Sequence, residues 1–228
     1  MKSSRFAIAA CAAVVLSFTS FVAGADTIYV SPTGNDDNDG LTPETAVKSL
    51  RVAVAKNTKD VTLLRGHHLC DLSLGGVMTS SNFSGGKLRG ETDNPRDTVL
   101  DFDGTSGCLV NLASTYAFDM SNMTCSNAVL NKTVLMNFGS SANQSVKVVI
   151  SNCVFTCNSL TNAPSISSAV MCIGSKVLVT DCLFEGNSTV AYSPAITTRS
   201  GGRIENCIFR KTRARTPPAL LPWCSAMP

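Results

Sequence analysis

The most regular feature of the chain is a six-residue pattern of apolar and polar positions that recurs four times in its second half. Each copy has an apolar residue, two polar residues, Cys or Met, a variable residue, and then Phe or Cys. The four copies are Met120–Cys125, Ile150–Phe155, Val179–Phe184 and Ile204–Phe209. Their first residues lie 30, 29 and 25 positions apart, which is typical of solenoid repeats. We therefore interpret one repeat as one turn of a coil.

The spacing inside the repeat indicates a bend. Successive side chains of a β-strand point to opposite faces, so apolar residues three positions apart share a face only where the chain turns between them. The polar pair supplies this turn, because such residues tolerate corners and bond to nearby backbone. The second residues of the four pairs are Asn122, Asn152, Asp181 and Asn206. Each repeat therefore predicts a strand, a corner and a second strand.

Stacked repeats of this form predict an all-β fold, a parallel β-helix solenoid over residues 26–212. A β-sandwich would instead show turn signals about every 8–12 residues. Equivalent residues of successive coils lie about 4.8 Å apart and form ladders. The two inward ladders predicted are Met123, Cys153, Cys182 and Cys207, and Cys125, Phe155, Phe184 and Phe209. A coil of roughly 27 residues gives about seven turns.

A short capping helix is predicted before the first full coil. Thr42 is a good N-cap and Pro43 suits the first helical position. The apolar residues that would share one face of this helix are Val47, Leu50 and Val54. Such a helix would cover the apolar end of the solenoid. Two further strands are expected, around Val61–Leu64 and Thr98–Phe102.

Both ends of the chain differ from the repeat. Lys2 and Arg5 precede the apolar run Phe6–Val22, and small residues follow it, so residues 1–25 are interpreted as a signal peptide of a secreted or cell-surface protein. No later segment is long and apolar enough for a transmembrane helix. Residues 213–228 contain four prolines and no repeat, which predicts an irregular tail. Because of this tail, one interpretation of the chain is that it is a truncated fragment of a larger β-helix protein.

Two motifs carry a resemblance to known families. The stretch Ile28–Leu50 begins Ile-Tyr-Val-Ser-Pro-Thr-Gly-Asn-Asp and resembles the start of secreted right-handed parallel β-helix proteins of the pectin-lyase-like superfamily. The Asn-Cys-x-Phe motif is similar to repeats of polymorphic outer-membrane and adhesin-like proteins. The resemblance covers residues 28–212. It implies right-handed coils and a monomeric structural or adhesin-like surface that interacts with polysaccharide or cell-surface glycans.

The alternative function is an extracellular polysaccharide lyase or glycoside hydrolase of the same fold. Such lyases generally need clustered acidic calcium ligands and a nearby Lys or Arg as base. The available candidates are Asp101, Asp103, Asp181, Lys176, Arg199 and Arg203. No pair of Asp residues recurs on consecutive coils, so no catalytic residue is assigned and enzyme activity stays an open question.

The sequence offers weak metal motifs only. The first half of an EF-hand-like calcium loop is matched by Asn35, Asp37, Asp39 and Gly40. Ala46 stands where the bidentate Glu is needed, so an Asx-rich turn is the favoured interpretation and no metal or cofactor site is assigned. His67 and His68 lack zinc-ligand spacing and are expected at the surface. The 19 basic and 16 acidic residues give no strong field for nucleic acid.

Cysteines and sequons complete the candidate chemistry. Cys153, Cys182 and Cys207 would stack about 4.8 Å apart, which is compatible both with a disulfide and with a stack of buried thiols. Five N-glycosylation sequons occur, at Asn82, Asn122, Asn131, Asn143 and Asn187. Asn122 is a corner residue and the poorest acceptor, and the others are expected in loops of a glycoprotein.

Overall fold

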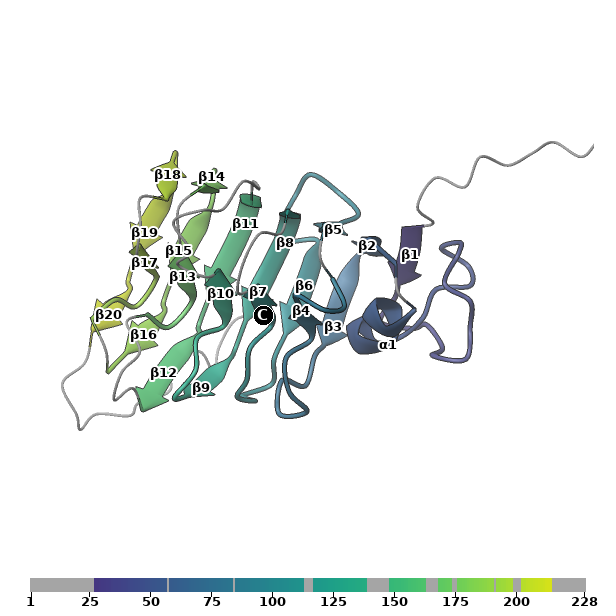
Figure 1. Cartoon of the computed structure of the whole chain (residues 1–228), viewed down its shortest axis with the longest axis horizontal. Helices are drawn as coiled ribbons and strands as arrows, with labels where there is room; N and C mark the ends of the chain where they lie inside the picture. The colour runs from purple at the N-terminus through teal and green to yellow at the C-terminus, as the bar shows by residue number, and fades with distance from the viewer. Residues whose placement is uncertain are drawn as a thin grey trace, which may run out of the picture.

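The protein is a solenoid of stacked parallel strands, as Figure 1 shows. It has about six turns, where the repeat length predicted about seven. The computed structural model describes residues 27–56, 58–83, 85–112, 117–138, 148–162, 168–173, 176–190, 192–198 and 202–214. The all-β coil predicted from the repeat is confirmed. The expected signal peptide lies outside the described residues.

Three parallel sheets form the walls of the solenoid. The largest runs in the order β1 (Thr27–Val30), β2 (Asp60–Leu63), β5 (Gly86–Gly90), β8 (Phe118–Ser126), β11 (Val148–Thr156), β14 (Val177–Thr180) and β18 (Arg203–Glu205). Beyond the corner it continues with β3 (Gly66–Leu69), β6 (Thr98–Asp101), β15 (Leu183–Glu185) and β19 (Ile208–Arg210). The second sheet contains β4 (Met78–Thr79), β7 (Val110–Leu112), β10 (Met136–Phe138), β13 (Met171–Ile173) and β17 (Ile196–Thr198). The third contains β9 (Val129–Asn131), β12 (Ser159–Asn162), β16 (Ser188–Thr189) and β20 (Arg213–Ala214).

The corner predicted from the polar pairs is confirmed. The corner residues Asn122, Asn152, Asp181 and Asn206 have positive φ angles of 62°, 47°, 55° and 50°. Asn and Asp adopt this left-handed conformation more readily than other residues with a side chain. The Nδ2 of Asn152 donates to Oδ1 of Asn122 at 3.0 Å, so these two corner residues are linked from coil to coil.

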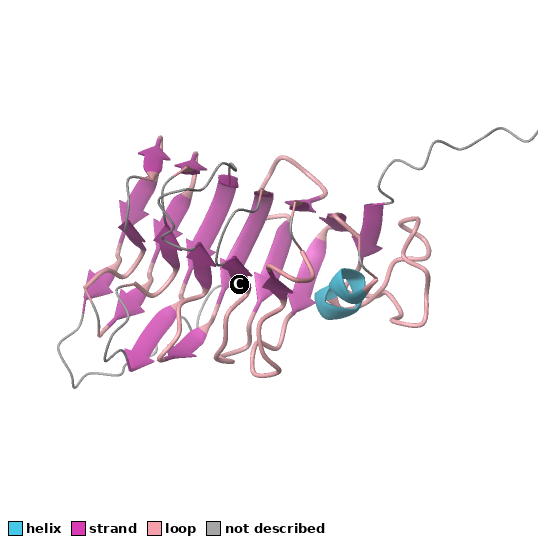
Figure 2. Ribbon diagram, in the orientation of Figure 1, coloured by secondary structure: helices cyan, strands magenta, loops and turns pink. Residues whose placement is uncertain are grey.

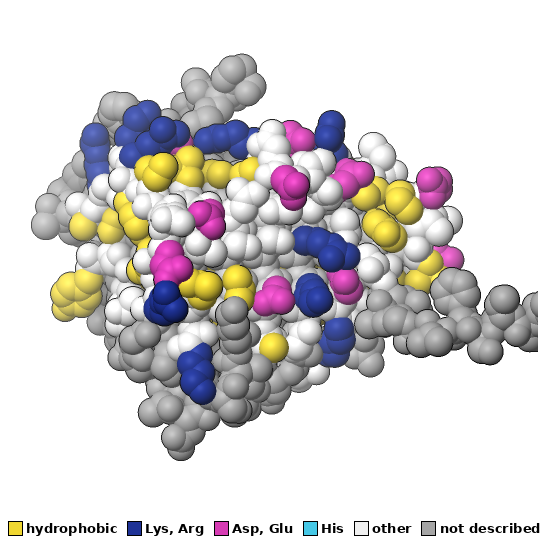
Figure 3. All heavy atoms as spheres, turned by 90° about the horizontal axis from the view of Figure 1, so that it is seen from above, with side chains coloured by type: hydrophobic (Ala, Val, Ile, Leu, Met, Phe, Trp, Pro, Cys, Tyr) yellow, Lys and Arg dark blue, Asp and Glu magenta, His cyan; other side chains and the backbone are white. Residues whose placement is uncertain are grey.

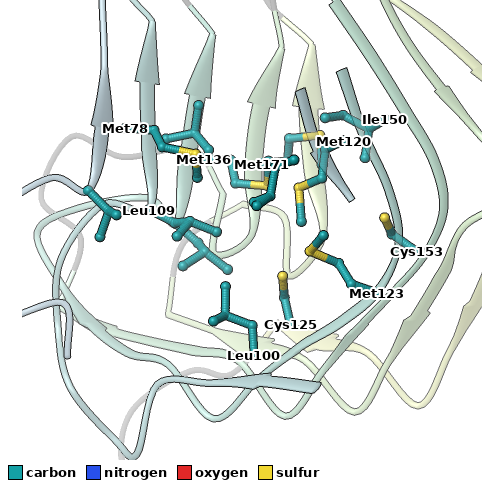
Figure 4. Packing of buried hydrophobic residues seen from close by; sticks show 14 of the residues in the cluster. Met78, Leu100, Leu109, Met120, Met123, Cys125, Met136, Ile150, Cys153 and Met171 are labelled. Carbon is teal, nitrogen blue, oxygen red and sulfur yellow. The ribbon is translucent and has the colours of Figure 1, made fainter. Parts of the chain in front are cut away.

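The two predicted ladders form: Met123, Cys153 and Cys182 are buried, as are the members of the other ladder up to Phe184, whereas Phe209 of the last coil is 46% exposed. Cys125 pairs with Phe155, Phe155 with Phe184, and Phe184 with Phe209. The rings of Phe155 and Phe184 stack at 5.0 Å between centroids, and those of Phe184 and Phe209 at 4.9 Å. Sulfur-containing side chains fill much of the remaining interior (Figure 4), where Met120 and Met136 are buried. Unbranched thioethers suit an irregular, narrow core.

A second corner, which the sequence did not reveal, follows the phenylalanine ladder. Its residues with positive φ are Asn127, Cys157, Gly186 and Lys211. Just beyond it, Asn158 and Asn187 are completely buried. Their side chains satisfy backbone groups of neighbouring coils, which is how a buried bend avoids unpaired polar atoms.

The capping helix exists, but the predicted start was wrong. Helix α1 spans Leu50–Ala55, with Ser49 as N-cap, and Figure 2 shows it at the N-terminal end of the solenoid. Thr42 instead belongs to a turn in which the Thr45 nitrogen donates to its carbonyl at 3.2 Å. Turns and bends fill much of residues 32–45, and Val47 then pairs with Val30 of β1, so the helix begins only after this pairing. No helix in the described ranges is long and apolar enough to span a membrane.

Candidate functional site

The outer face of the largest sheet carries two rows of side chains in register, which we call the polar face. The first row consists of Thr27, Asp60, Lys87, Asp119, Val149, Leu178 and Arg203. The second row consists of Tyr29, Thr62, Arg89, Ser121, Ser151, Thr180 and Glu205. Because neighbouring strands lie about 4.8 Å apart, each row presents a side chain at every step along the solenoid.

A shallow hollow lies in the middle of the polar face. It has a volume of about 290 Å³, and the residues that line it come from β5, β8 and β11. The polar lining groups are Lys87, Arg89, Asp119, Ser121 and Ser151. These groups offer donors and acceptors in a small area, so the hollow suits a hydroxyl-rich ligand.

Arg89 is held in place beside this hollow. Its Nη2 lies 3.2 Å from Oδ2 of Asp60, and its Nε donates to Oγ1 of Thr62 at 3.1 Å. The other Asp60 oxygen, Oδ1, is buried and has no hydrogen-bond partner among the described residues. The side chain of Lys87 is exposed and stands in register between Asp60 and Asp119. Opposite charges therefore alternate along the first row here.

A second polar cluster joins two residues that the sequence analysis treated separately. The Nε2 of His67 lies 2.9 Å from Oδ2 of Asp101. Nδ2 of Asn127 lies 3.1 Å from each carboxylate oxygen of Asp101, and the Asp103 nitrogen donates to Oδ1 at 2.9 Å. The carboxylate is thus fixed and orients an exposed imidazole, because β3 pairs with β6 in this register.

His68 is buried, whereas the sequence predicted a position at the surface. The residue is only 3% exposed, because it alternates with His67 on β3 and points inward. Its Nε2 lies 2.7 Å from the Leu64 carbonyl oxygen, while Nδ1 is buried without a hydrogen-bond partner in the described part of the chain. Burial lowers the pKa of this imidazole, which favours its neutral form.

Three basic side chains surround one carboxylate near the C-terminal end. Glu185 lies 2.9 Å from Nη2 of Arg210, 3.8 Å from Nζ of Lys211 and 3.9 Å from Nη2 of Arg96. The hydrogen bond from Arg210 holds the pKa of Glu185 below its usual value. This cluster was not predictable from the sequence, since Arg96 lies 89 positions before Glu185 in the chain.

The structure does not gather the lyase candidates into one site. Asp101 and Asp103 lie at the end of β6, whereas Asp181 occupies the first corner of a later coil. Lys176 lies in the turn before β14, and Arg203 lies on β18. Arg199 is outside the described residues. Asp181 accepts a hydrogen bond from Thr180 and is one of the four residues with positive φ at the first corner.

The loop that resembled a calcium site is held by its own hydrogen bonds. Oδ1 of Asn35 accepts from the Asp37 nitrogen at 3.1 Å, and Oδ1 of Asp39 accepts from Oγ1 of Thr45 at 2.6 Å. This second bond is the largest cause that lowers the pKa of Asp39. Within the ranges described, no group of three or more His, Cys, Asp or Glu side chains is placed to hold a metal ion.

The cysteine stack consists of free thiols. Cys153, Cys182 and Cys207 are unbridged. Each sulfur donates to the carbonyl two residues earlier, at 3.2, 3.1 and 3.2 Å respectively. A repeated local bond thus orients the thiols, and the alternative of a disulfide within the stack is not realised.

The sequence predicted four of the five sequons in loops, at Asn82, Asn131, Asn143 and Asn187. The structure differs from this expectation. Asn187 is fully buried, and Asn82 uses its amide to bond Thr79 and Val77. Asn131 is exposed on β9. Asn143 lies outside the described residues.

Comparison of the chain with protein-family models, curated proteins and solved structures gave no match. The class of protein is therefore defined by the fold alone, as a parallel β-solenoid.

Proposed function

We propose that the protein is a secreted or cell-surface β-solenoid whose polar face binds an extended polysaccharide, in a structural or adhesin-like role. The observation that carries this proposal is the register of the two rows across seven strands. An extended polymer that lies along the rows meets a hydroxyl or charged side chain of the second row at every coil. The likeness of the sequence to pectin-lyase-like and adhesin-like proteins agrees with this proposal, although fold alone does not define function.

The charges of the polar face favour an uncharged polysaccharide. Its basic residues are Lys87, Arg89 and Arg203, and its acidic residues are Asp60, Asp119 and Glu205. These charges balance, so recognition depends on hydrogen bonds to sugar hydroxyls more than on a net field. Tyr29 adds an aromatic surface at the N-terminal end of the second row.

Binding to a panel of neutral and anionic polysaccharides, measured by calorimetry with purified protein, tests the proposal. We expect a neutral polymer to bind, with little dependence on salt. Ser121→Trp fills the hollow and Arg89→Ala removes its central donor, so both variants should weaken binding about tenfold or more. Lys48→Ala removes one exposed charge from the N-terminal loop and is the matched control. Binding unchanged in both polar-face variants, or absent for every polymer, would contradict the proposal.

One observation supports the alternative that the protein is a polysaccharide-cleaving enzyme. An imidazole oriented by a fixed carboxylate, as in His67 and Asp101, is an arrangement suited to general-base chemistry. Incubation with uronic-acid and neutral polymers, with and without calcium, should then release unsaturated products or new reducing ends. His67→Gln should abolish that release. If no product forms with the wild-type protein, this alternative is rejected while the binding proposal stands.

A further inference from the structure

Both histidines of the chain lie next to each other on β3. The chain contains two histidines, His67 and His68, and histidine is the side chain whose ordinary pKa lies between pH 5 and 8. Figure 3 shows Lys and Arg side chains mixed with Asp and Glu side chains over one face of the molecule. Such groups ordinarily keep their charges between about pH 5.5 and 7.5. A response of the protein to mild acid is therefore expected to begin at β3.

One buried residue holds β3 against the core. Of the four residues of this strand, Gly66 is half-buried, His67 and Leu69 are exposed, and His68 is buried. Leu69 is 67% exposed, so the leucine of this strand faces away from the core. Among the described strands, β3 pairs with β6 alone. A short strand with one partner and one core side chain belongs to the parts of a fold that open locally.

The pairing of β3 with β6 encloses two polar side chains with unused hydrogen-bonding capacity. His68 lies opposite Leu100, and Thr98 lies two residues earlier on β6. Nδ1 of His68 and Oγ1 of Thr98 are both buried, and neither has a hydrogen-bond partner among the described residues. Because buried polar atoms without a partner cost free energy, they weaken the attachment of β3 to β6.

The one hydrogen bond of the His68 ring determines where a proton would bind. Its Nε2 lies 2.7 Å from the Leu64 carbonyl oxygen. A carbonyl oxygen only accepts, so Nε2 carries the hydrogen of the neutral ring and Nδ1 carries the lone pair. A further proton must therefore bind at Nδ1. The new N–H group would lack an acceptor there, and the positive charge would lie inside the core.

The described groups around His68 do not compensate such a charge. On the inner side lie the thiols of Cys70 and Cys125, which stay neutral because burial raises the pKa of both. On the outer side, Asp101 is already paired with His67. Two nearby cations also bond elsewhere, Arg65 to Asp97 and Arg51 to the carbonyl oxygens of Asp71 and Gly75. A charge on the ring is thus unfavourable as long as β3 stays closed.

We infer that β3 is an acid-sensitive strand, which lies closed on β6 while His68 is neutral and detaches when His68 binds a proton. In the detached strand the imidazole reaches water, which solvates its charge. Detachment uncovers the interior beside Leu100 and separates His67 from Asp101. Mild acid therefore opens the wall of the solenoid at the coil that contains β2, β3 and β4.

The pH range of this opening follows from the direction of the pKa change. Burial is the largest cause that lowers the pKa of His68 in the closed strand; the hydrogen bond to Leu64 raises it by less, and a charge on His67 lowers it further. In the open strand the imidazole has its ordinary pKa of about 6.5. Below about pH 6.5 the open strand therefore binds a proton that the closed strand does not. The open population then rises by up to about tenfold for each unit by which the pH falls.

Hydrogen–deuterium exchange of the purified protein tests the inference. Mass spectrometry measures the exchange at about pH 7.5, 6.5 and 5.5, with a correction for the intrinsic exchange rate at each pH. Backbone amides of β3 should lose protection in acid, by up to about tenfold per pH unit below about pH 6.5. Amides of β11, which lies in the middle of the largest sheet, are the internal reference and should change little.

Two variants remove the titrating group and keep the strand. His68→Gln retains a donor for the Leu64 carbonyl, and His68→Leu places an apolar side chain in the core; neither new side chain titrates. In both variants the protection of β3 should be the same at about pH 7.5 and 5.5. His67→Gln is the matched control. It changes the imidazole on the outer side of the same strand and should retain the loss of protection in acid, because burial of His68 is unchanged.

Three results would overturn the inference. The first is equal protection of β3 in neutral and acidic solution in the wild-type protein. The second is an acid response that persists in a folded His68 variant, with circular dichroism as the check of folding. The third is an equal loss of protection in β3 and β11, since that would indicate global unfolding. If one His68 variant does not fold, the other decides, and if neither folds, loss of the acid response in His67→Gln would overturn the inference.

Discussion

The side-chain oxygen of Asn187 accepts a hydrogen bond from the backbone nitrogen of Asn158, one coil earlier, at 2.9 Å. Both residues are completely buried. The Nδ2 of Asn187 donates to the Phe155 carbonyl at 2.8 Å, and that of Asn158 donates to the Cys125 carbonyl at 3.1 Å. The two amides thus take the place of the backbone bonds that the second corner interrupts.

Asn187→Ala should lower the free energy of unfolding by about 2–4 kcal/mol, because the Asn158 nitrogen and the Phe155 carbonyl both lose a buried partner. Urea unfolding followed by circular dichroism measures the loss. Asn131→Ala, at an exposed Asn of the same coil wall, is the control and should change stability by no more than about 0.5 kcal/mol. Equal losses in the two variants would contradict the stabilising role of the buried Asn187 amide.

N-glycosylation should distinguish the same two residues. In a host that glycosylates secreted proteins, Asn131 should be modified because its side chain is exposed. Asn187 should stay unmodified in folded protein, since a glycan cannot enter the core where its amide lies. Mass spectrometry of the peptides reads both sites, with Asn131→Gln as the control. A glycan on Asn187 of folded, secreted protein would disprove the buried position of this residue.

The first corner was predictable because four residues with the same chemistry recur at one place in the repeat. The second corner was not, since its residues differ in kind: Asn127 and Gly186 are familiar in the left-handed conformation, whereas Cys157 and Lys211 are not. These two residues share a position in successive coils with Asn127 and Gly186, but no residue type recurs there that would have revealed the corner. A pattern of residue types therefore reveals a corner at which one type recurs and misses one at which the types differ.

The polar face was missed for a related reason. Lys87 lies 27 positions from Asp60 and 32 from Asp119, and the coils that contain Asp60 and Lys87 lack the Cys motif that would have aligned them. The His67–Asp101 contact likewise depends on the pairing of β3 with β6. Both residues of that pair were considered singly in the sequence, but their proximity comes from the register alone.

The conformation of the first corner can be tested at Asp181, which has a φ of 55°. Asp181→Asn should be nearly neutral, because Asn tolerates the left-handed region. Asp181→Val should lower the free energy of unfolding by about 1–2 kcal/mol or more, since a β-branched residue is strained there. Chemical unfolding of both variants measures the difference. Equal stability of the two would show that the corner does not require a residue tolerant of positive φ.

The buried thiols predict how stability depends on alkaline pH. Burial raises the pKa of Cys70 and of Cys108 from 9.0 to about 12. Above pH 9 the unfolded chain therefore releases thiol protons that the folded protein retains. Because the unfolded state then binds fewer protons, the free energy of unfolding falls as the pH rises, by up to about 1.4 kcal/mol per pH unit for each thiol.

Urea unfolding at a series of pH values from 7 to about 10.5 measures this slope. Lysine and tyrosine side chains also titrate in this range, so the informative quantity is the difference between proteins. Cys108→Ala should reduce the alkaline slope relative to wild type, whatever its effect on stability at pH 7. Thr133→Ala, which removes no titrating group, should leave the slope unchanged. Identical slopes in the wild-type and Cys108→Ala proteins would show that this thiol ionises as readily in the folded state as in the unfolded chain.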